Sequence, residues 1–355
     1  MKKIISVDVW DSPEKKLEFY NRVINSQDED VIFFAYHEPT YDDISLPKIH
    51  EILDFLSKQN RKLKVVLGCY QHDVHFKHPN LEVYTWVDFF LRKTFFHSLH
   101  VSRCRETNYG ELNYYKQALN PTSFDHYFVS LNRRSHRHRC HLIDLMAKNN
   151  LIEGNAIGWH NMIGFGSVSD TYPWQYFKPQ VLSLSDTTDF DRHGMLVPNE
   201  YFKAFGQIVC ESTDEVIFIT EKTGISLVCH KPFLIAGPVG IHEKLKSMNF
   251  EPYDEIFNYD FDMEPNEEKR YQLVLDNFIR LQNEYSKDDL VDLYKKLLPK
   301  LKHNFENLKK VVFDMSDLPL PVSDVYNIYK STGIKCDHWT AEILSFLEDT
   351  KHLVK

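Results

Sequence analysis

Apolar and polar positions alternate along the start of the chain in the order expected for strands and helices. Residues 4–10 alternate between the two types, as in a half-buried strand, and residues 31–36 form a continuous apolar run, as in a strand covered on both faces. Between them, Ser12 and Pro13 are a good N-cap and first helical residue for a helix that ends at about Asn25. The pattern predicts strand, helix, strand.

The same alternation continues and begins again near residue 125. Further strands are predicted at 63–67, 81–87, 127–131, 155–159, 205–209 and around Leu234. Further helices are predicted after Pro47, up to Asn150, from Glu221, at 241–249 and at about 266–300. Residues 161–196 are rich in Gly, Ser, Asp and Thr and are predicted to form a long loop region. Strands that alternate with helices indicate parallel sheets with flanking helices.

A chain of 355 residues is long enough for two domains of ordinary size. We therefore predict an α/β protein with two Rossmann-like domains, 1–124 and 125–310, that face each other across a cleft. Residues 311–355 are predicted to form a helical tail, with segments at 323–331 and 338–350.

Composition narrows the class of protein. Hydrophobic residues make up 43% and charged residues 26%, which is typical of a globular chain, and the net charge of −9 disfavours bulk binding to nucleic acid but leaves a local basic groove open. No apolar run reaches the ~20 residues of a membrane span, and the run after Met1 is too short for a signal peptide. Six cysteines lie far apart without a C-x-x-C, so we expect reduced thiols and a cytoplasmic protein.

The polar residues that suit chemistry follow the ends of predicted strands, where parallel sheets bind ligands. These positions are His37, Glu38, the loop 132–139, Glu211, Glu221 and Lys222. In the last pair, Lys222 suits a phosphate and Glu221 suits ribose hydroxyls, and the helix start adds free N–H groups and a positive dipole end. Alone, that pair is also typical of an exposed helix start.

The loop from Asn132 to Arg139 contains four arginines between a strand and a helix. One or two of them, with Arg139 and Arg137 as candidates, would neutralise a diphosphate through the planar guanidinium fork. The alternative is a solvated basic helix start, which the helix dipole opposes.

Glu38 follows an apolar strand and is a candidate general base for an acceptor hydroxyl, with His37 as its neighbouring alternative. Glu38 could instead cap a turn before Pro39. No metal site is predicted. The histidines of 72–78 match no second ligand set, and the D-x-D triplets at 189–191 and 260–262 follow no clear strand.

Three segments in order resemble the inverting α-1,3-fucosyltransferases, which have the two-domain GT-B fold. These segments are Phe128–Asn132 with Arg139, then Ile208–Thr213, then Thr220-Glu221-Lys222, and Tyr36-His37-Glu38 is a looser match. The resemblance implies that Arg139 and Lys222 contact the donor pyrophosphate, that Glu221 contacts ribose, and that Glu38 is the catalytic base. The chain differs from the family at Cys210, Ser212 and Thr223-Gly224.

These residues lead to the hypothesis of a metal-independent, inverting glycosyltransferase that needs no cofactor. Its donor would be a nucleoside diphosphate sugar, GDP- or UDP-linked, and its acceptor a hydroxyl of a carbohydrate or another molecule. Glu211 would contact the donor or support the structure. One alternative is a glycosyltransferase that acts on hydroxylated bases in DNA, and another is a non-catalytic module that binds glycans or nucleotides.

Overall fold

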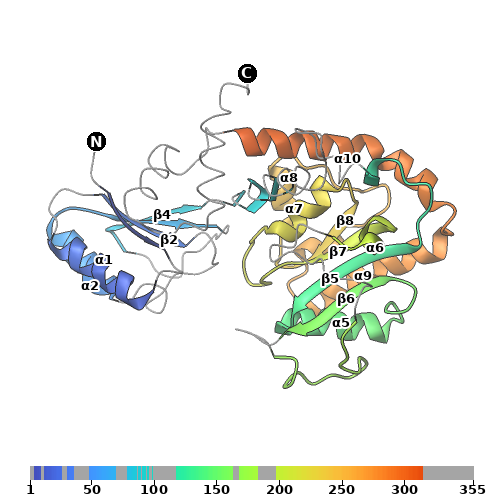
Figure 1. Cartoon of the computed structure of the whole chain (residues 1–355), viewed down its shortest axis with the longest axis horizontal. Coiled ribbons are helices and arrows are strands. Elements are labelled where there is room, and N and C mark those ends of the chain that lie inside the picture. The colour runs from blue at the N-terminus through green and yellow to red at the C-terminus, as the bar shows by residue number, and fades with distance from the viewer. Residues whose placement is uncertain are drawn as a thin grey trace. The chain divides into compact units, whose positions relative to one another are not determined.

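The structure of the protein is a computed structural model, and Figure 1 shows the whole chain. The residues that it describes are 4–8, 12–25, 30–35, 48–68, 78–85, 87–88, 90–92, 94–95, 98, 117–162, 168–182 and 197–314. The chain divides into two compact units, which are described separately below. Unit 1 contains Met1–Lys93 and Val311–Lys355, and unit 2 contains Thr94–Lys310.

Unit 1 contains a four-stranded parallel sheet in the order β1-β2-β3-β4. The strands are β1 (Ile4–Asp8), β2 (Asp30–Ala35), β3 (Leu63–Leu67) and β4 (Leu81–Thr85), and the helices are α1 (Pro13–Asn25) and α2 (Ile49–Lys58). Helix α1 packs on β1 and α2 packs on β3, and the two helices also contact each other, so they cover one face of the sheet. The parallel sheet predicted from the sequence is therefore confirmed in this unit.

The buried side chain of Arg92 connects two distant parts of the chain within unit 1. Its Nη1 donates to the carbonyl oxygen of Val312 at 2.7 Å, and its Nη2 donates to that of Asp314 at 2.8 Å. These carbonyls lie at the end of helix α10 (Leu290–Phe313), where the last C=O groups of a helix have no partner within the helix. Residues 312 and 314 therefore bind to the N-terminal unit at a helix C-terminus.

Unit 2 contains a second four-stranded parallel sheet, in the order β6-β5-β7-β8. The strands are β5 (His126–Arg134), β6 (Ala156–Met162), β7 (Ala204–Cys210) and β8 (Phe233–Ala236). The helices and 3-10 turns are η1 (Gln117–Leu119), α5 (Arg137–Lys148), α6 (Asn199–Phe202), α7 (Glu221–Val228), α8 (Ile241–Ser247), η3 (Asp260–Met263), α9 (Glu267–Glu284) and α10. Every residue of β7 and β8 is buried, as expected for parallel strands that helices cover on both faces.

The single helix predicted at 266–300 is wrong, because two helices occupy this region. Helix α9 ends at Glu284. Ser286 then forms the cap of the next helix, because its N–H and its hydroxyl donate to Asp289 Oδ2 at 2.9 and 2.6 Å. This Ser-x-x-Asp arrangement resembles a capping box, which starts a helix. Helix α10 then continues through Pro299 to Phe313, because its apolar face, which includes Leu301 and Leu308, remains buried.

Helix α5 binds part of the predicted loop region 161–196 through the side chain of Asp144. Three backbone N–H groups, those of Gln175, Tyr176 and Phe177, donate to the buried carboxylate of Asp144. Leu182 then forms an antiparallel bridge with Trp159 of β6. Residues 161–162 belong to β6, so the loop prediction is wrong for them. The other described part of this region, 168–182, is fixed to the edge of the second sheet.

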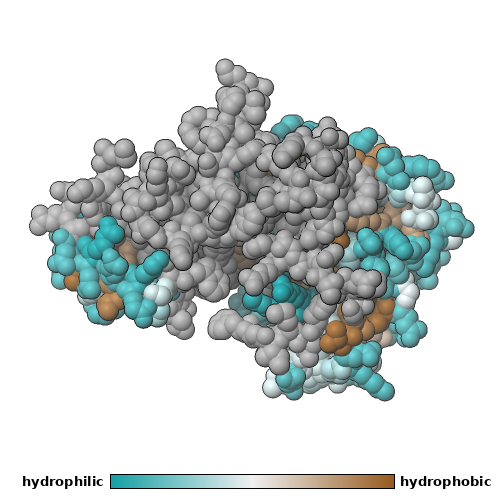
Figure 2. Space-filling view, viewed as in Figure 1, coloured by the Kyte–Doolittle hydropathy of each residue, from teal (hydrophilic) through white to brown (hydrophobic). Residues whose placement is uncertain are grey.

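Exposed apolar side chains are scattered over the described surface. They include Leu17 on α1, Tyr176 and Val181 beside β6, and Val239 and Met263 near α8. On the face that Figure 2 shows, brown residues lie among hydrophilic teal ones. Within the part of the chain that the structure describes, no helix is both long and apolar enough to cross a membrane.

The buried thiols agree with the prediction of reduced core cysteines at the three described positions. Cys140, Cys210 and Cys229 are all buried and unpaired. Burial raises the pKa of the Cys210 thiol to about 12, so this thiol is protonated at neutral pH and is a poor nucleophile. The other three cysteines lie outside the described residues.

The burial of Lys231, which lies just before β8, leads us to expect a specific dependence of stability on pH. Its side chain is 3% exposed, and its Nζ donates to the carbonyl oxygen of Ala204 and lies 4.8 Å from the centre of the Tyr201 ring. Burial lowers the pKa of this amine to about 7, against about 10.4 for a lysine in an unfolded chain. The unfolded state therefore binds more protons between these values, and stability falls as the pH decreases through that window by roughly 1.4 kcal/mol per pH unit.

We expect Lys231→Met to remove this dependence. The free energy of unfolding of the variant minus that of the parent should rise as the pH falls from 10 to 7 and should level off below 7. Denaturant unfolding of both proteins at each pH measures this difference and cancels the other titrating groups. Lys203→Met, which changes an exposed lysine, is the control. Parallel curves for parent and Lys231→Met would contradict the prediction.

Candidate functional site

The strand order of unit 2 marks one place where a ligand is expected. After β5 the chain forms β6 on one side of β5. It then crosses to the other side of β5, where it forms β7 and then β8, so the direction of the strand order reverses between β5 and β7. Open α/β sheets bind ligands beyond the carboxyl ends of the strands at such a switch point. β5 ends at Arg134 and β7 ends at Cys210, so the predicted residues Asn132, Arg139 and Glu211 meet here.

The basic loop predicted at 132–139 is mostly regular structure. β5 extends to Arg134, and α5 begins at Arg137 with His136 as its N-cap residue. Only a short turn separates strand and helix, so Arg139 lies in the first turn of α5, close to the end of β7. This arrangement divides the four arginines, because Arg139 is 4% exposed whereas the other three are exposed.

Arg139 is a buried cation whose hydrogen bonds go to carbonyl oxygens. Its Nη2 donates to the carbonyl oxygen of Glu211 at 3.0 Å, and its Nη1 donates to that of Arg134 at 3.3 Å. Among the described residues, its buried Nε has no hydrogen-bond partner, and no carboxylate lies within 4 Å of the guanidinium. A buried charge without a paired charge is costly, so this site favours an anion.

Two further polar atoms, one near the end of β5 and one in the turn that follows it, have no partner among the described residues. The Oδ1 of Asn132 and the Oγ of Ser135 are buried and accept or donate no hydrogen bond within the described chain. The amide nitrogen of Asn132 is used, because it donates to Ser130 Oγ at 3.0 Å. Buried polar groups normally have partners, so a cluster of such atoms is typical of a site that a polar ligand or water completes. Ser135 is not among the site residues predicted from the sequence, because its residue type alone gives no signal.

The side chain of Lys222 points back toward the end of β7. Its Nζ donates to Ser212 Oγ at 3.0 Å, to Thr220 Oγ1 at 3.1 Å and to Glu221 Oε1 at 2.8 Å. The side chain is 22% exposed, so part of the ammonium group can reach a ligand. Lys222 and Arg139 therefore bind to two consecutive residues, Ser212 and Glu211.

Glu221 lies beside this ammonium group with its side chain 33% exposed. Burial alone would raise the pKa of its carboxyl, but the charge and hydrogen bond of Lys222 outweigh burial and lower it. Glu221 is therefore ionised at neutral pH and accepts hydrogen bonds. A partly exposed carboxylate of this kind suits the hydroxyls of a ribose.

Glu211 is completely buried, and protein groups occupy both of its carboxylate oxygens. Thr220 N and Thr223 Oγ1 donate to Oε1 at 3.0 and 2.6 Å, and the Thr220 hydroxyl donates to Oε2. The Thr220 side chain in turn accepts from Lys222 N at 3.4 Å. The expectation of free N–H groups at the start of α7 is therefore wrong for Thr220 and Lys222, whose N–H groups bind within the protein.

His138 is a buried member of the site that was not among the residues predicted from the sequence. Its Nε2 lies 3.0 Å from the carbonyl oxygen of Glu211, and its Nδ1 lies 3.6 Å from Asp214 Oδ1. Burial, with a contribution from the charge of Arg139, lowers the pKa of His138 to about 4, despite the opposing charge of Asp214. The imidazole is therefore neutral at neutral pH, and because a carbonyl oxygen only accepts, its proton lies on Nε2.

Several predicted site residues lie apart from this cluster or outside the described chain. Arg137 is exposed on the first turn of α5, and no described contact brings it to Lys222. His37 and Glu38 lie outside the described residues, so the catalytic role predicted for them stays a prediction.

One D-x-D triplet has a structural role. Asp262 accepts hydrogen bonds from the backbone N–H groups of His242 and Glu243 at 3.0 and 2.9 Å and so caps helix α8. Asp260 accepts from Asn258 Nδ2 at 2.9 Å. Among the residues that the structure describes, no group of three or more His, Cys, Asp and Glu side chains could hold a metal ion.

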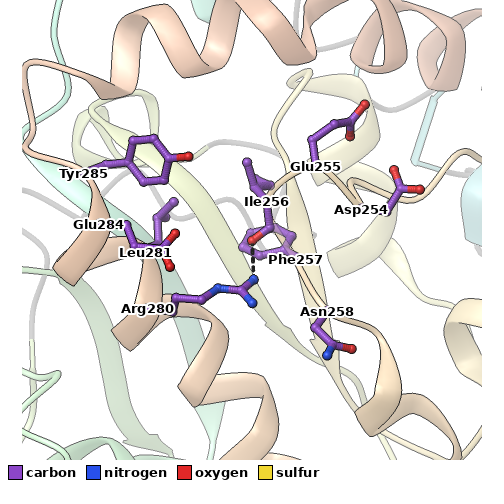
Figure 3. Close-up of a pocket in the computed structure, with 9 residues that line it drawn as sticks. All are labelled: Asp254, Glu255, Ile256, Phe257, Asn258, Arg280, Leu281, Glu284 and Tyr285. Atoms are coloured by element: carbon purple, nitrogen blue, oxygen red, sulfur yellow. Dashed lines mark hydrogen bonds between the residues drawn. The ribbon is translucent and has the colours of Figure 1, made fainter.

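A pocket of about 410 Å³ lies at the other end of the second sheet. Its lining residues are Asp254, Glu255, Ile256, Phe257, Asn258, Arg280, Leu281, Glu284 and Tyr285. Figure 3 shows Arg280 pointing toward the carbonyl oxygen of Ile256, to which it donates at 2.8 Å. Tyr285 binds Tyr127 at the start of β5, so this pocket is near the amino ends of the strands. It is therefore separate from the cluster at the carboxyl ends.

Comparison with known proteins does not assign the chain to a family. No protein-family model and no curated protein sequence matches it. Among solved structures it is similar to one described as an α1,3-fucosyltransferase, with 13% sequence identity and a TM-score of 0.32, over 97% of this chain and 91% of that chain. A TM-score this low carries no argument, so the function must be inferred from the residues themselves.

Proposed function

We propose that the protein is a glycosyltransferase that transfers a sugar from a nucleoside diphosphate sugar to an acceptor hydroxyl. One observation carries the proposal: Arg139 and Lys222, from two different helices, bind to the consecutive residues Glu211 and Ser212 at the switch point of the sheet. Two cations that converge at this position suit a diphosphate better than a single phosphate or a neutral ligand.

In this reaction the bond between the sugar and the diphosphate breaks, and negative charge develops on the departing oxygen. Lys222 would contact the diphosphate directly, because its side chain is 22% exposed. Arg139 would act through its charge and its unpartnered Nε. Such preorganised positive charge stabilises the transition state and is the largest contribution in many enzymes.

The other residues predicted from the sequence would have the following roles. Glu221 would accept hydrogen bonds from the ribose, and Asn132 would bind the donor through its unpartnered Oδ1. Glu38, with His37 as the alternative, would take the proton of the acceptor hydroxyl as it attacks the sugar with inversion. The donor would be GDP- or UDP-linked, and the positive charge of Arg139 and Lys222 would make a metal ion unnecessary.

A donor screen tests the proposal. The protein is incubated with GDP-, UDP-, CDP- and ADP-linked sugars and a mixture of hydroxyl acceptors, and released nucleoside diphosphate is measured. We expect one donor to be consumed and Lys222→Ala to reduce its turnover by about 100-fold or more, as the loss of one charge-stabilising donor does. Lys246→Ala, which removes an exposed lysine of α8, is the control and should retain activity.

Two outcomes would contradict the proposal. Turnover of Lys222→Ala within a few-fold of the parent would remove Lys222 from the site. Tight binding of a nucleoside diphosphate sugar with no release of nucleoside diphosphate under any acceptor would instead indicate a non-catalytic binding module.

A further inference from the structure

Glu211 contacts both of the helices that carry the proposed diphosphate-binding cations, although it cannot reach a ligand itself. Its side chain is 0% exposed, and each carboxylate oxygen already accepts a hydrogen bond from the N-cap or the first turn of α7. A buried carboxylate in this position is stabilised by the positive end of the helix dipole. The side chain of Glu211 therefore fixes the start of α7.

The backbone of the same residue fixes the start of α5. The carbonyl oxygen of Glu211 accepts from Arg139 Nη2 and from His138 Nε2, both at 3.0 Å. A carbonyl oxygen has two lone pairs, so these two donors use its capacity. One residue at the end of β7 thus connects the helix that carries Arg139 to the helix that carries Lys222.

The Thr220 hydroxyl connects the Glu211 carboxyl group to Lys222. This hydroxyl donates its proton to Glu211 Oε2, which leaves its lone pairs for Lys222 N at 3.4 Å and Lys222 Nζ at 3.1 Å. Because Oε2 of Glu211 accepts this hydrogen bond, the hydroxyl proton points toward Glu211 and away from Lys222. The direction in turn makes Thr220 an acceptor for the ammonium group of Lys222.

We propose that Glu211 is a positioning residue that sets the geometry of the diphosphate site through Thr220 and Lys222 and through Arg139. For its ligand, this inference rests on the function proposed above. It differs from the sequence-based expectation of a donor contact, because Glu211 acts here only through other residues.

Glu211→Gln tests this role with almost no change of shape. The amide NH₂ of glutamine must face either the Thr220 hydroxyl or the Thr220 N–H. In the first case it donates to the hydroxyl and competes with Lys222, and in the second case two donors face each other. We expect the affinity for inorganic pyrophosphate, measured by calorimetry, to fall roughly tenfold, as for a lost hydrogen bond to a charged group.

A double-mutant cycle separates positioning from general damage to the fold. If Glu211 acts through Lys222, adding Glu211→Gln to Lys222→Ala should change the pyrophosphate affinity by less than about twofold. Asp262→Asn is the matched control, because Asp262 is also a buried carboxylate that caps a helix start, that of α8. Its melting temperature should fall while its pyrophosphate affinity stays within twofold of the parent.

The outcomes distinguish this inference from the proposed function. If the parent binds pyrophosphate and Glu211→Gln binds equally well, or if the two substitutions act independently, the positioning role is overturned and the proposed function stands. If the parent binds neither pyrophosphate nor a nucleoside diphosphate, the proposed function is overturned. Hydrogen exchange of the ligand-free protein then decides the inference: Glu211→Gln should accelerate exchange at 220–223 but not at 126–134, and unchanged exchange at 220–223 would overturn it.

Discussion

Arg139→Met is expected to reduce sugar transfer by about 100- to 1,000-fold, the range typical of removing one group that stabilises developing negative charge. The substitution removes a charge that is 4% exposed and has no carboxylate within 4 Å among the described residues. In such a poorly solvated position a charge acts over a longer range than it does in water. Methionine keeps much of the length of the side chain, so the effect should arise from the lost charge rather than from a cavity.

Turnover and pyrophosphate affinity of the purified variant measure this effect, and thermal unfolding shows whether the fold survives. We expect a stability change of only about 1 to 3 kcal/mol, because the lost hydrogen bonds leave the carbonyl oxygens of Arg134 and Glu211 with fewer donors. Arg134→Met is the control, because it removes the same charge from an exposed position at the end of β5. Equal activity of the two variants would contradict the role of Arg139.

Gly224→Ala is expected to lower the stability of unit 2 by about 2 kcal/mol. A methyl group at residue 224 would lie 2.8 Å from Cβ and Oγ1 of Thr94 and 2.9 Å from its Cγ2, far inside the usual contact distance of about 3.5 to 4.0 Å. Thr94 is completely buried, so it cannot turn away into solvent. Overpacking of this kind costs about 1 to 3 kcal/mol, and more in tight sites, whereas the better helix propensity of alanine returns about 1 kcal/mol.

Thermal unfolding should therefore show a decrease of about 4 to 8 °C for Gly224→Ala. The double variant Thr94→Gly/Gly224→Ala should recover part of this loss relative to the sum of the single changes. Thr94→Ala should recover less, because the Cβ of residue 94 itself lies 2.8 Å from the new methyl group. Additive effects in both double variants would show that this contact does not limit the packing of α7.

The Gly224→Ala substitution should also affect the candidate site. Gly224 lies in α7 two residues after Lys222, and α7 carries the ammonium group that we assign to the diphosphate. A displacement of α7 should therefore lower turnover even where the protein remains folded. The close approach to Thr94 also gives a physical reason for a glycine at position 224.

Hydrophobic patterns predicted most of the regular structure, because parallel strands covered on both faces are continuous apolar runs. The eight strands found among the described residues were all expected at or near their positions, including β8, which lies before Gly237. The helix boundary at Glu284, which the sequence prediction missed, has a local signal in the capping residues Ser286 and Asp289. The domain boundary at 124 stays a prediction, and the units observed by contacts join residues after 310 to the N-terminal unit.

The sequence by itself determined which residues could carry charge to the carboxyl ends of the strands, because each candidate follows an apolar run. Only the tertiary structure decided which of four neighbouring arginines is buried, since all four share one loop and one residue type, and only the folded contact with the Glu211 carbonyl separates Arg139 from the rest. It also decided that Glu211 faces inward. A glutamate after a strand looks the same in the sequence whether its carboxylate meets a ligand or, as here, the first turn of α7, because its partners Thr220 and Thr223 lie nine and twelve residues further along the chain.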